Sequence, residues 1–157
     1  AFVFTCRSRR PPLDNVNALL SFAYSLLASD CAAALEGAGL DPYVGFLHRA
    51  RPGRRSLALD LMEELRTVLA DRFVLSCINQ KVLNAKHFEK QENGAVLLTE
   101  EGRRAFLNAW QQKKRAVITH PFLKEKLCWG LVPYVQALLL ARTLRGDLEV
   151  YPPFFWK

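Results

Sequence analysis

A histidine and two acidic residues between positions 39 and 66 have the types and spacing that could bind a divalent cation. His48 follows a short apolar strip, and Asp60 and Glu63 lie three residues apart in a stretch with helical periodicity. On a helix, that spacing puts both carboxylates on one face, one turn apart. Imidazole nitrogen and carboxylate oxygen suit a cation such as Mg²⁺ or Mn²⁺. The sequence therefore predicts a metal site at His48, Glu63 and Asp60.

Arginines surround these candidate ligands. Four lie between the histidine and the acidic helix and one follows the acids: Arg49, Arg51, Arg54, Arg55 and Arg66. Guanidinium groups pair well with phosphate oxygens. Metal ligands and phosphate-binding groups in one segment indicate phosphodiester chemistry, with these five arginines as the predicted DNA-binding residues.

Each of these features also has a simpler explanation. A histidine beside apolar residues is often a hydrogen-bonded structural residue, and acidic residues in the first turns of a helix stabilise its dipole. The acids could also form salt bridges with the neighbouring arginines. His87 and His120 have few potential ligand neighbours and are expected to be structural. A non-enzymatic helical module for DNA binding or assembly is therefore the alternative.

Composition favours one basic domain. The 157 residues are 50% hydrophobic and carry a net charge of +7, which is compatible with nucleic acid or an acidic membrane. The apolar stretch 131–141 is too short to span a bilayer and contains Pro133, so no membrane association is expected. The four cysteines are scattered singly, which argues against a zinc knuckle and indicates a reducing, cytoplasmic location.

The chain reads as mainly α, a single helical domain with one small β-hairpin. Apolar periodicity and end signals predict helices over residues 16–36, 57–80, 100–118 and 131–145. Residues 86–90 and 95–98 flank Asn93-Gly94, a favoured hairpin turn. Residues 1–13 lead into the first helix. The tail, residues 151–157, is expected to be partly ordered, with aromatic side chains that fill a groove of the protein rather than stack on bases.

Four long segments carry a family resemblance. They are PPLDNVNALLSFAYSLL (11–27), GLDPYVGFLHRARPGRRSLALDLMEELR (39–66), ADRFVL (70–75) and VQALLLARTLRGDLEVYPPFFWK (135–157). Together they resemble the CRISPR-associated adaptation integrase "Cas-one" (Cas1), closely so for the version found in subtype I-C, over essentially the whole chain.

The resemblance implies a metal-dependent DNA endonuclease and integrase of antiviral defence, which inserts DNA segments into a CRISPR array. It implies a homodimer, a small partner protein "Cas-two" (Cas2), and a helical C-terminal catalytic domain without the family's N-terminal β domain. The family histidine of the Gly-Phe-x-His motif falls on His48, and the family's helical acid falls on Glu63, with Asp60 one turn earlier.

The resemblance also implies a missing ligand. The remaining family glutamate belongs to a Glu-Gly motif upstream of the segment that begins here at Pro11. The Glu-Gly pairs of this sequence, at 36–37 and 101–102, lie downstream of that position. The chain is therefore expected to be the C-terminal portion of a longer protein, and weakly active or inactive alone.

Overall fold

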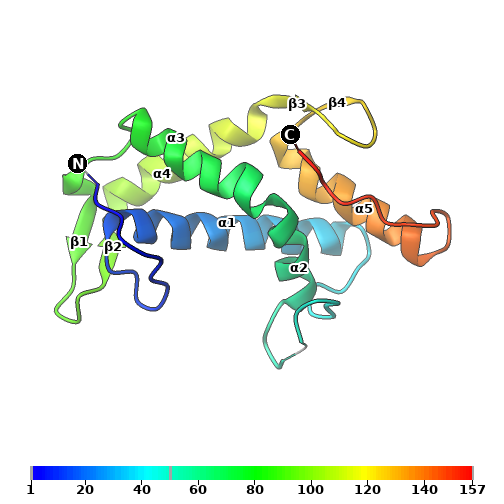
Figure 1. The fold of residues 1–157 in the computed structure, drawn as a ribbon, viewed down its shortest axis with the longest axis horizontal. Helices are drawn as coiled ribbons and strands as arrows, with labels where there is room; N and C mark the ends of the chain where they lie inside the picture. Colours follow the sequence, from blue (N-terminus) through cyan, green and yellow to red (C-terminus); the bar gives the residue numbers. More distant parts are fainter. Residues whose placement is uncertain (1, 50, 157) are drawn as a thin grey trace.

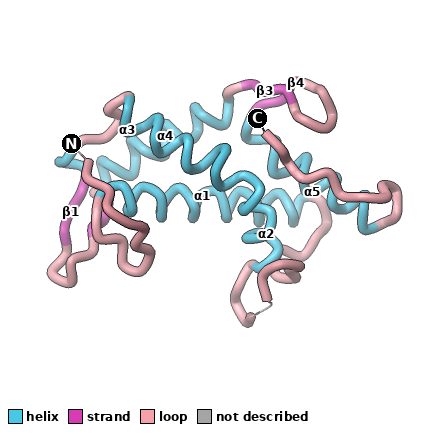
Figure 2. Tube along the Cα trace, in the orientation of Figure 1, coloured by secondary structure: helices cyan, strands magenta, loops and turns pink. Residues whose placement is uncertain are grey.

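The computed structural model describes residues 2–49 and 51–156, and its architecture is mainly helical (Figure 1, Figure 2). The α-helices are α1 (Asn15–Gly37), α2 (Ser56–Leu65), α3 (Arg72–Asn79), α4 (Glu100–Arg115) and α5 (Val132–Leu144). The strands are β1 (Phe88–Lys90), β2 (Val96–Leu98), β3 (Val117–Thr119) and β4 (Lys126–Cys128). A π-helical segment (Arg66–Asp71) joins α2 to α3, and 3-10 turns (Ala85–His87, Trp129–Leu131) precede β1 and α5.

Helix α1 is the centre of the core, and the other helices pack along it (Figure 1). Its side chains at four-residue spacing are almost fully buried: Leu19, Ala23, Leu27, Cys31 and Leu35. Asp14 accepts a hydrogen bond from the backbone N–H of Asn17 at 2.8 Å and so caps the helix. The prediction of a helix over residues 16–36 is confirmed.

By length and apolar composition alone, α1 would also pass for a membrane-spanning helix, and it is the one such helix within residues 2–49 and 51–156. Its buried face packs against α2 and α5. The central helix of a protein core has the same length and composition, so this property follows from its place in the fold.

The segment predicted as one helix over residues 57–80 is helical to Asn79 but is not one α-helix. The π-helical turn of residues 66–71 interrupts it, and α2 and α3 then run in different directions (Figure 1). A π-turn inserts one residue into the helical repeat and so changes the face that the following residues present. The interruption lies directly after the acidic residues of the candidate site.

One predicted hairpin is confirmed, and a second was not predicted. Strands β1 and β2 pair antiparallel with Phe88 opposite Leu98. Strands β3 and β4 form another pair with Val117 opposite Cys128, so the expectation of a single hairpin is wrong. The predicted helix 100–118 accordingly ends at Arg115, because the run Val117–Thr119 is β-branched and favours an extended backbone.

Both chain ends lie against the helices in the described residues. Near the start, the Arg7 side chain donates to Asn17 at 2.6 Å. Near the end, Phe154 is buried and Phe155 is exposed. Ala1 and Lys157, the outer residues of the predicted terminal segments, lie outside the described residues.

Candidate functional site

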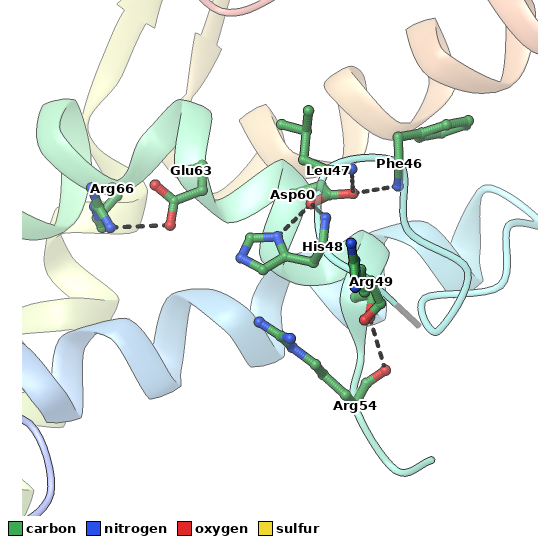
Figure 3. Close-up of polar contacts among 9 residues, drawn as sticks. Phe46, Leu47, His48, Arg49, Arg54, Asp60, Glu63 and Arg66 are labelled. Atoms are coloured by element: carbon green, nitrogen blue, oxygen red, sulfur yellow. Dashed lines mark hydrogen bonds and ion pairs between the residues drawn. The ribbon is translucent and has the colours of Figure 1, made fainter. Parts of the chain in front are cut away.

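Asp60 organises the loop that carries His48. Its carboxylate accepts hydrogen bonds from the backbone N–H groups of Phe46 at 2.6 Å, Leu47 at 3.0 Å and His48 at 3.0 Å (Figure 3). Three successive donors converge on this one buried side chain of α2. Asp60 therefore sets the conformation of the backbone on which the imidazole is mounted.

The same carboxylate also binds the imidazole ring. The Nδ1 atom of His48 lies 2.5 Å from the Asp60 Oδ1 atom. Burial raises the pKa of Asp60, but the hydrogen bonds from His48 and the three backbone N–H groups outweigh it and hold that pKa below its usual value. Because Asp60 is ionised, Nδ1 carries the ring proton and donates it to the carboxylate. This contact leaves Nε2 as the ring nitrogen that can face a cation, as in a metal-ligating histidine held by a carboxylate.

Gly45 allows the loop to approach α2 closely. A Cβ atom at this position would lie 2.6 Å from the Cβ of Ser56 and 2.9 Å from the Oδ2 of Asp60. Both separations are too short for non-bonded atoms, so a side chain at position 45 would push the loop away. The glycine before Phe46 is thus a steric requirement of the Asp60 contacts.

Ser56 closes the arginine loop. Its hydroxyl is buried and donates to the backbone oxygen of Arg49 at 3.1 Å, instead of capping α2. The first free N–H groups of the helix, those of Leu57 and Ala58, donate to Pro42 O at 2.9 and 3.2 Å. The start of α2 therefore donates hydrogen bonds to the preceding segment at two places, Pro42 and Arg49.

Glu63 lies one turn beyond Asp60 on the same helix. Its side chain is 35% exposed and forms an ion pair with Arg66 at 3.0 Å. Figure 3 shows the His48 ring between Asp60 and Glu63, with Arg66 on the far side of Glu63. The arrangement gives the three predicted residues different roles: Asp60 holds His48, whereas His48 and Glu63 keep donor atoms within reach of solvent.

The described residues do not by themselves form a cluster of three metal ligands. No group of three or more His, Cys, Asp or Glu side chains in residues 2–49 and 51–156 is arranged to hold a metal ion. His48 Nε2 and the Glu63 carboxylate are suitable donors for Mg²⁺ or Mn²⁺ and would provide two ligands. The metal-binding roles of His48, Glu63 and Asp60 stay predictions.

The predicted DNA-binding arginines differ in their surroundings. Arg49, Arg51 and Arg55 are exposed on the loop, and Arg54 is half-buried on the same side of the loop as the His48 ring (Figure 3). Arg66 pairs with Glu63. All five belong to the loop or to the helical turn that follows Glu63, so they surround the candidate site, and their contact with DNA stays a prediction.

Arg7 and Tyr24, which lie outside the segment 39–66, pack beside Arg66 of the candidate site. The guanidinium groups of Arg66 and Arg7 lie 5.9 and 5.4 Å from the ring centroid of Tyr24. The hydroxyl of Tyr24 donates to Asp71 at 2.6 Å, and burial, with this bond, raises its pKa to about 12. The helical spacing of Tyr24 was visible in the sequence, but its proximity to Arg7 and Arg66 depends on the packing of α1.

Glu64, the next acid on α2, belongs to the core. Its carboxylate accepts from the Tyr151 hydroxyl at 2.8 Å, from Gln136 Nε2 at 3.1 Å and from the backbone N–H of Phe154 at 3.0 Å. These bonds tie α2 to α5 and to the C-terminal tail. Within the described residues, every buried side-chain nitrogen and oxygen has a hydrogen-bond partner. Glu64 thus belongs to the core, whereas its neighbour Glu63 belongs to the candidate site.

An apolar groove of about 470 Å³ adjoins the site between the loop, α2 and the tail. Phe46 and Leu47 from the loop face Leu57, Leu61 and Leu140 across it. Asp60 lines this groove, so its carboxylate lies between a nonpolar surface and the arginine loop.

The comparisons with known proteins agree on one family. A family model described as CRISPR associated protein Cas1 matches residues 1–112. A Rhodospirillum rubrum protein, CRISPR-associated endonuclease Cas1 2, is 63% identical over 156 residues, which are 99% of this chain and 45% of that protein. The chain thus spans about half the length of the curated relatives that it matches first.

Solved structures resemble the chain as well. A casposase bound to integration product superposes with a TM-score of 0.87 at 28% identity, over 99% of this chain and 47% of that chain. A partial Cas6-RT-Cas1–Cas2 complex contains a chain with a TM-score of 0.79 at 29% identity, over 99% of this chain and 46% of that chain.

Proposed function

The chain belongs to the Cas1 family of CRISPR-associated proteins, and from this premise we propose that it is the helical C-terminal part of a divalent-metal-dependent DNA endonuclease and integrase. The observation that carries the proposal is the pairing of His48 with Asp60 beside Glu63. The whole protein would cut and join DNA phosphodiesters during spacer acquisition. The proposal also includes the I-C subtype, a cytoplasmic location and a homodimer. It further includes a Cas2 partner, and the similarity to a chain of a Cas1–Cas2 complex supports that partner.

The residues of this chain would have distinct tasks in that reaction. Asp60 orients His48 and keeps the proton on Nδ1, so that Nε2 and the Glu63 carboxylate can hold Mg²⁺ or Mn²⁺. A bound cation would supply Lewis-acid activation of the phosphodiester and of the attacking oxygen. A third ligand would come from the part of the protein outside this sequence.

The arginines would act on the DNA backbone. Arg54 and Arg66 flank the His48 and Glu63 side chains, where charge on the phosphate oxygens increases during the reaction. The exposed arginines of the loop would bind neighbouring phosphates without sequence preference and with a strong salt dependence.

Substitution of the two candidate ligands in the full-length protein tests this proposal. His48→Ala and Glu63→Ala are expected to fold and to lose strand cutting and joining in Mn²⁺. Glu89→Ala, which removes an exposed carboxylate from β1, is the matched control and should keep both activities. Full activity in folded His48→Ala and Glu63→Ala would overturn the assignment.

The isolated 157-residue chain gives a second test. With two donors instead of three, it should bind Mn²⁺ weakly and cut DNA poorly, because affinity for such ions depends on ligand number and charge. Robust cutting by the isolated chain that Glu63→Ala abolishes would contradict the expectation of a missing ligand.

One observation favours the alternative of a non-enzymatic DNA-binding or assembly module. Glu63 is already paired with Arg66 at 3.0 Å, which is the salt bridge that such a module would use. Crystals of the full-length protein soaked in Mn²⁺ separate the two functions. An anomalous peak between His48 and Glu63 supports the enzyme, and its absence supports the module.

A further inference from the structure

A second pocket, of about 570 Å³, lies between the β3–β4 loop and the C-terminal tail. Phe122 and Lys124 of the loop and Phe155 and Trp156 of the tail are among the residues that line it. Figure 1 shows the C-terminal end beside β3 and β4, away from the loop between α1 and α2. The pocket has the volume of small-ligand sites and shares no residue with the His48 and Glu63 site.

The loop wall of this pocket is held in one shape by His120. The fully buried His120 ring donates from Nε2 to Gln136 at 2.8 Å, and its Nδ1 accepts the backbone N–H groups of Phe122 at 3.2 Å and Leu123 at 3.1 Å. The backbone N–H of Lys124 donates to the His120 carbonyl at 2.9 Å. Lys124 has a φ of 60°, a left-handed conformation that lysine rarely adopts. These contacts present the Phe122 and Lys124 side chains outward.

The tail wall is anchored by two of its aromatic residues, Phe154 and Trp156. Phe154 is buried against the His120 and Trp129 rings, with centroids 5.4 and 5.8 Å away, and Trp156 stacks parallel to Phe154. The backbone N–H of Phe155 donates to the Pro153 carbonyl at 3.0 Å, in a tight turn. The Phe155 side chain is 76% exposed. Phe154 and Trp156 therefore pack against the protein, as expected for the tail, whereas Phe155 is available to a ligand.

The surroundings of the pocket are basic. Lys124 lines the pocket, Lys126 follows two residues later, and both side chains are exposed. Exposed rings beside cations are the combination that binds single-stranded nucleic acid, since every base offers a flat face and every linkage a negative charge. An apolar peptide would use the rings but would not pair with the Lys124 cation.

We propose that the β3–β4 loop and the C-terminal tail form a second DNA subsite, which binds an unpaired stretch of strand. Phe155 and Phe122 stack on bases, and Lys124 binds a backbone phosphate. The inference rests on the proposed function only for the choice of DNA as the strand. It assigns a binding role to a region that is separate from the candidate metal site.

Binding of a fluorescein-labelled oligothymidylate of about ten nucleotides, followed by anisotropy in EDTA, tests the subsite in the full-length protein. Phe155→Leu keeps an apolar side chain but removes the flat ring, and it should weaken binding about tenfold. Phe155→Tyr should bind as tightly as the unsubstituted protein. Val150→Ala, at an apolar residue 78% exposed just before the tail, is the matched control and should leave affinity unchanged.

Lys124→Asn tests the phosphate contact. Asparagine tolerates the left-handed conformation, so the loop should keep its shape while the charge is lost. The slope of log affinity against log salt concentration should become shallower by about 0.7, the value for one phosphate contact on a single strand. An unchanged slope would overturn the role of Lys124.

Wild-type affinity of Phe155→Leu would overturn the subsite and identify the pocket as a purely apolar surface. An equal loss in Val150→Ala would also overturn it, because the effect would then come from the tail as a whole. Thermal unfolding of each variant checks that the fold is intact. The assay contains no divalent cation, so its result is independent of whether His48 and Glu63 prove to be metal ligands.

Discussion

Replacement of Asp60 by asparagine should reverse the proton position on His48. Asp60 accepts four hydrogen bonds on two oxygens, from three backbone N–H groups and the His48 ring. An asparagine has one oxygen, which can keep two of these donors, and an NH₂ group that would face the other two. If the oxygen stays with the Phe46 and Leu47 groups, the NH₂ group meets the imidazole. His48 can then relieve the conflict by moving its proton from Nδ1 to Nε2.

The structure also gives the size of the effect. Hydrogen bonds to a charged group contribute roughly 1.5–3 kcal/mol each, and the loop donors can turn to water, so the lower end applies. The His48 backbone N–H loses its acceptor and the other three contacts lose a charged one, so the free energy of unfolding should fall by about 2–3 kcal/mol. A protonated Nε2 cannot ligate a cation, and the loss of such an orienting carboxylate typically weakens metal binding about 10- to 100-fold.

Three measurements follow the change in the full-length protein. Long-range ¹H–¹⁵N NMR at slightly alkaline pH reports which ring nitrogen carries the proton, urea denaturation reports stability, and Mn²⁺ titration reports affinity. Glu89→Gln makes the same chemical change at an exposed carboxylate and should alter none of them. The reasoning fails if Asp60→Asn keeps the proton on Nδ1 and binds Mn²⁺ as tightly as the unsubstituted protein.

Further predictions concern the parts that support the site. Gly45→Ala should lower stability by about 1–3 kcal/mol in urea denaturation, because the new Cβ would lie 2.6 Å from a carbon of α2, whereas Gly37→Ala, with its nearest contact at 3.4 Å, should be tolerated. Tyr151→Phe removes a hydroxyl bonded to both α2 and α5 and should lower the melting temperature, at a cost of about 1–3 kcal/mol. Burial raises the pKa of Cys77 to about 11, whereas the thiol of the unfolded chain ionises near pH ~8.5. The stability that the protonated thiol contributes is present below that pH and should be lost as the pH rises toward 11. A thiol reagent at neutral pH should label exposed Cys6 and spare Cys77 until the protein unfolds.

Local patterns in the sequence were sufficient for the elements whose signals lie within a few residues. The helix expected over residues 16–36 is α1, and Asn93-Gly94 joins β1 to β2 as expected. The helix expected over residues 131–145 is α5, at Val132–Leu144. Such elements depend on side-chain periodicity, caps and turn residues, which can be read from the chain itself. The same local spacing, with the family resemblance, selected His48, Asp60 and Glu63 as candidates.

Only the tertiary structure decided what those residues do. Asp60 meets His48 across 12 residues of chain, and Glu64 meets Tyr151 across 87, so no local pattern could assign one acid to an imidazole and the next to the tail. The π-helical turn after α2 and the pairing of β3 with β4 likewise depend on contacts between distant segments. Helical spacing places carboxylates on a face, but the donors that converge on each carboxylate are supplied by whichever segments pack there, and packing is a property of the whole fold.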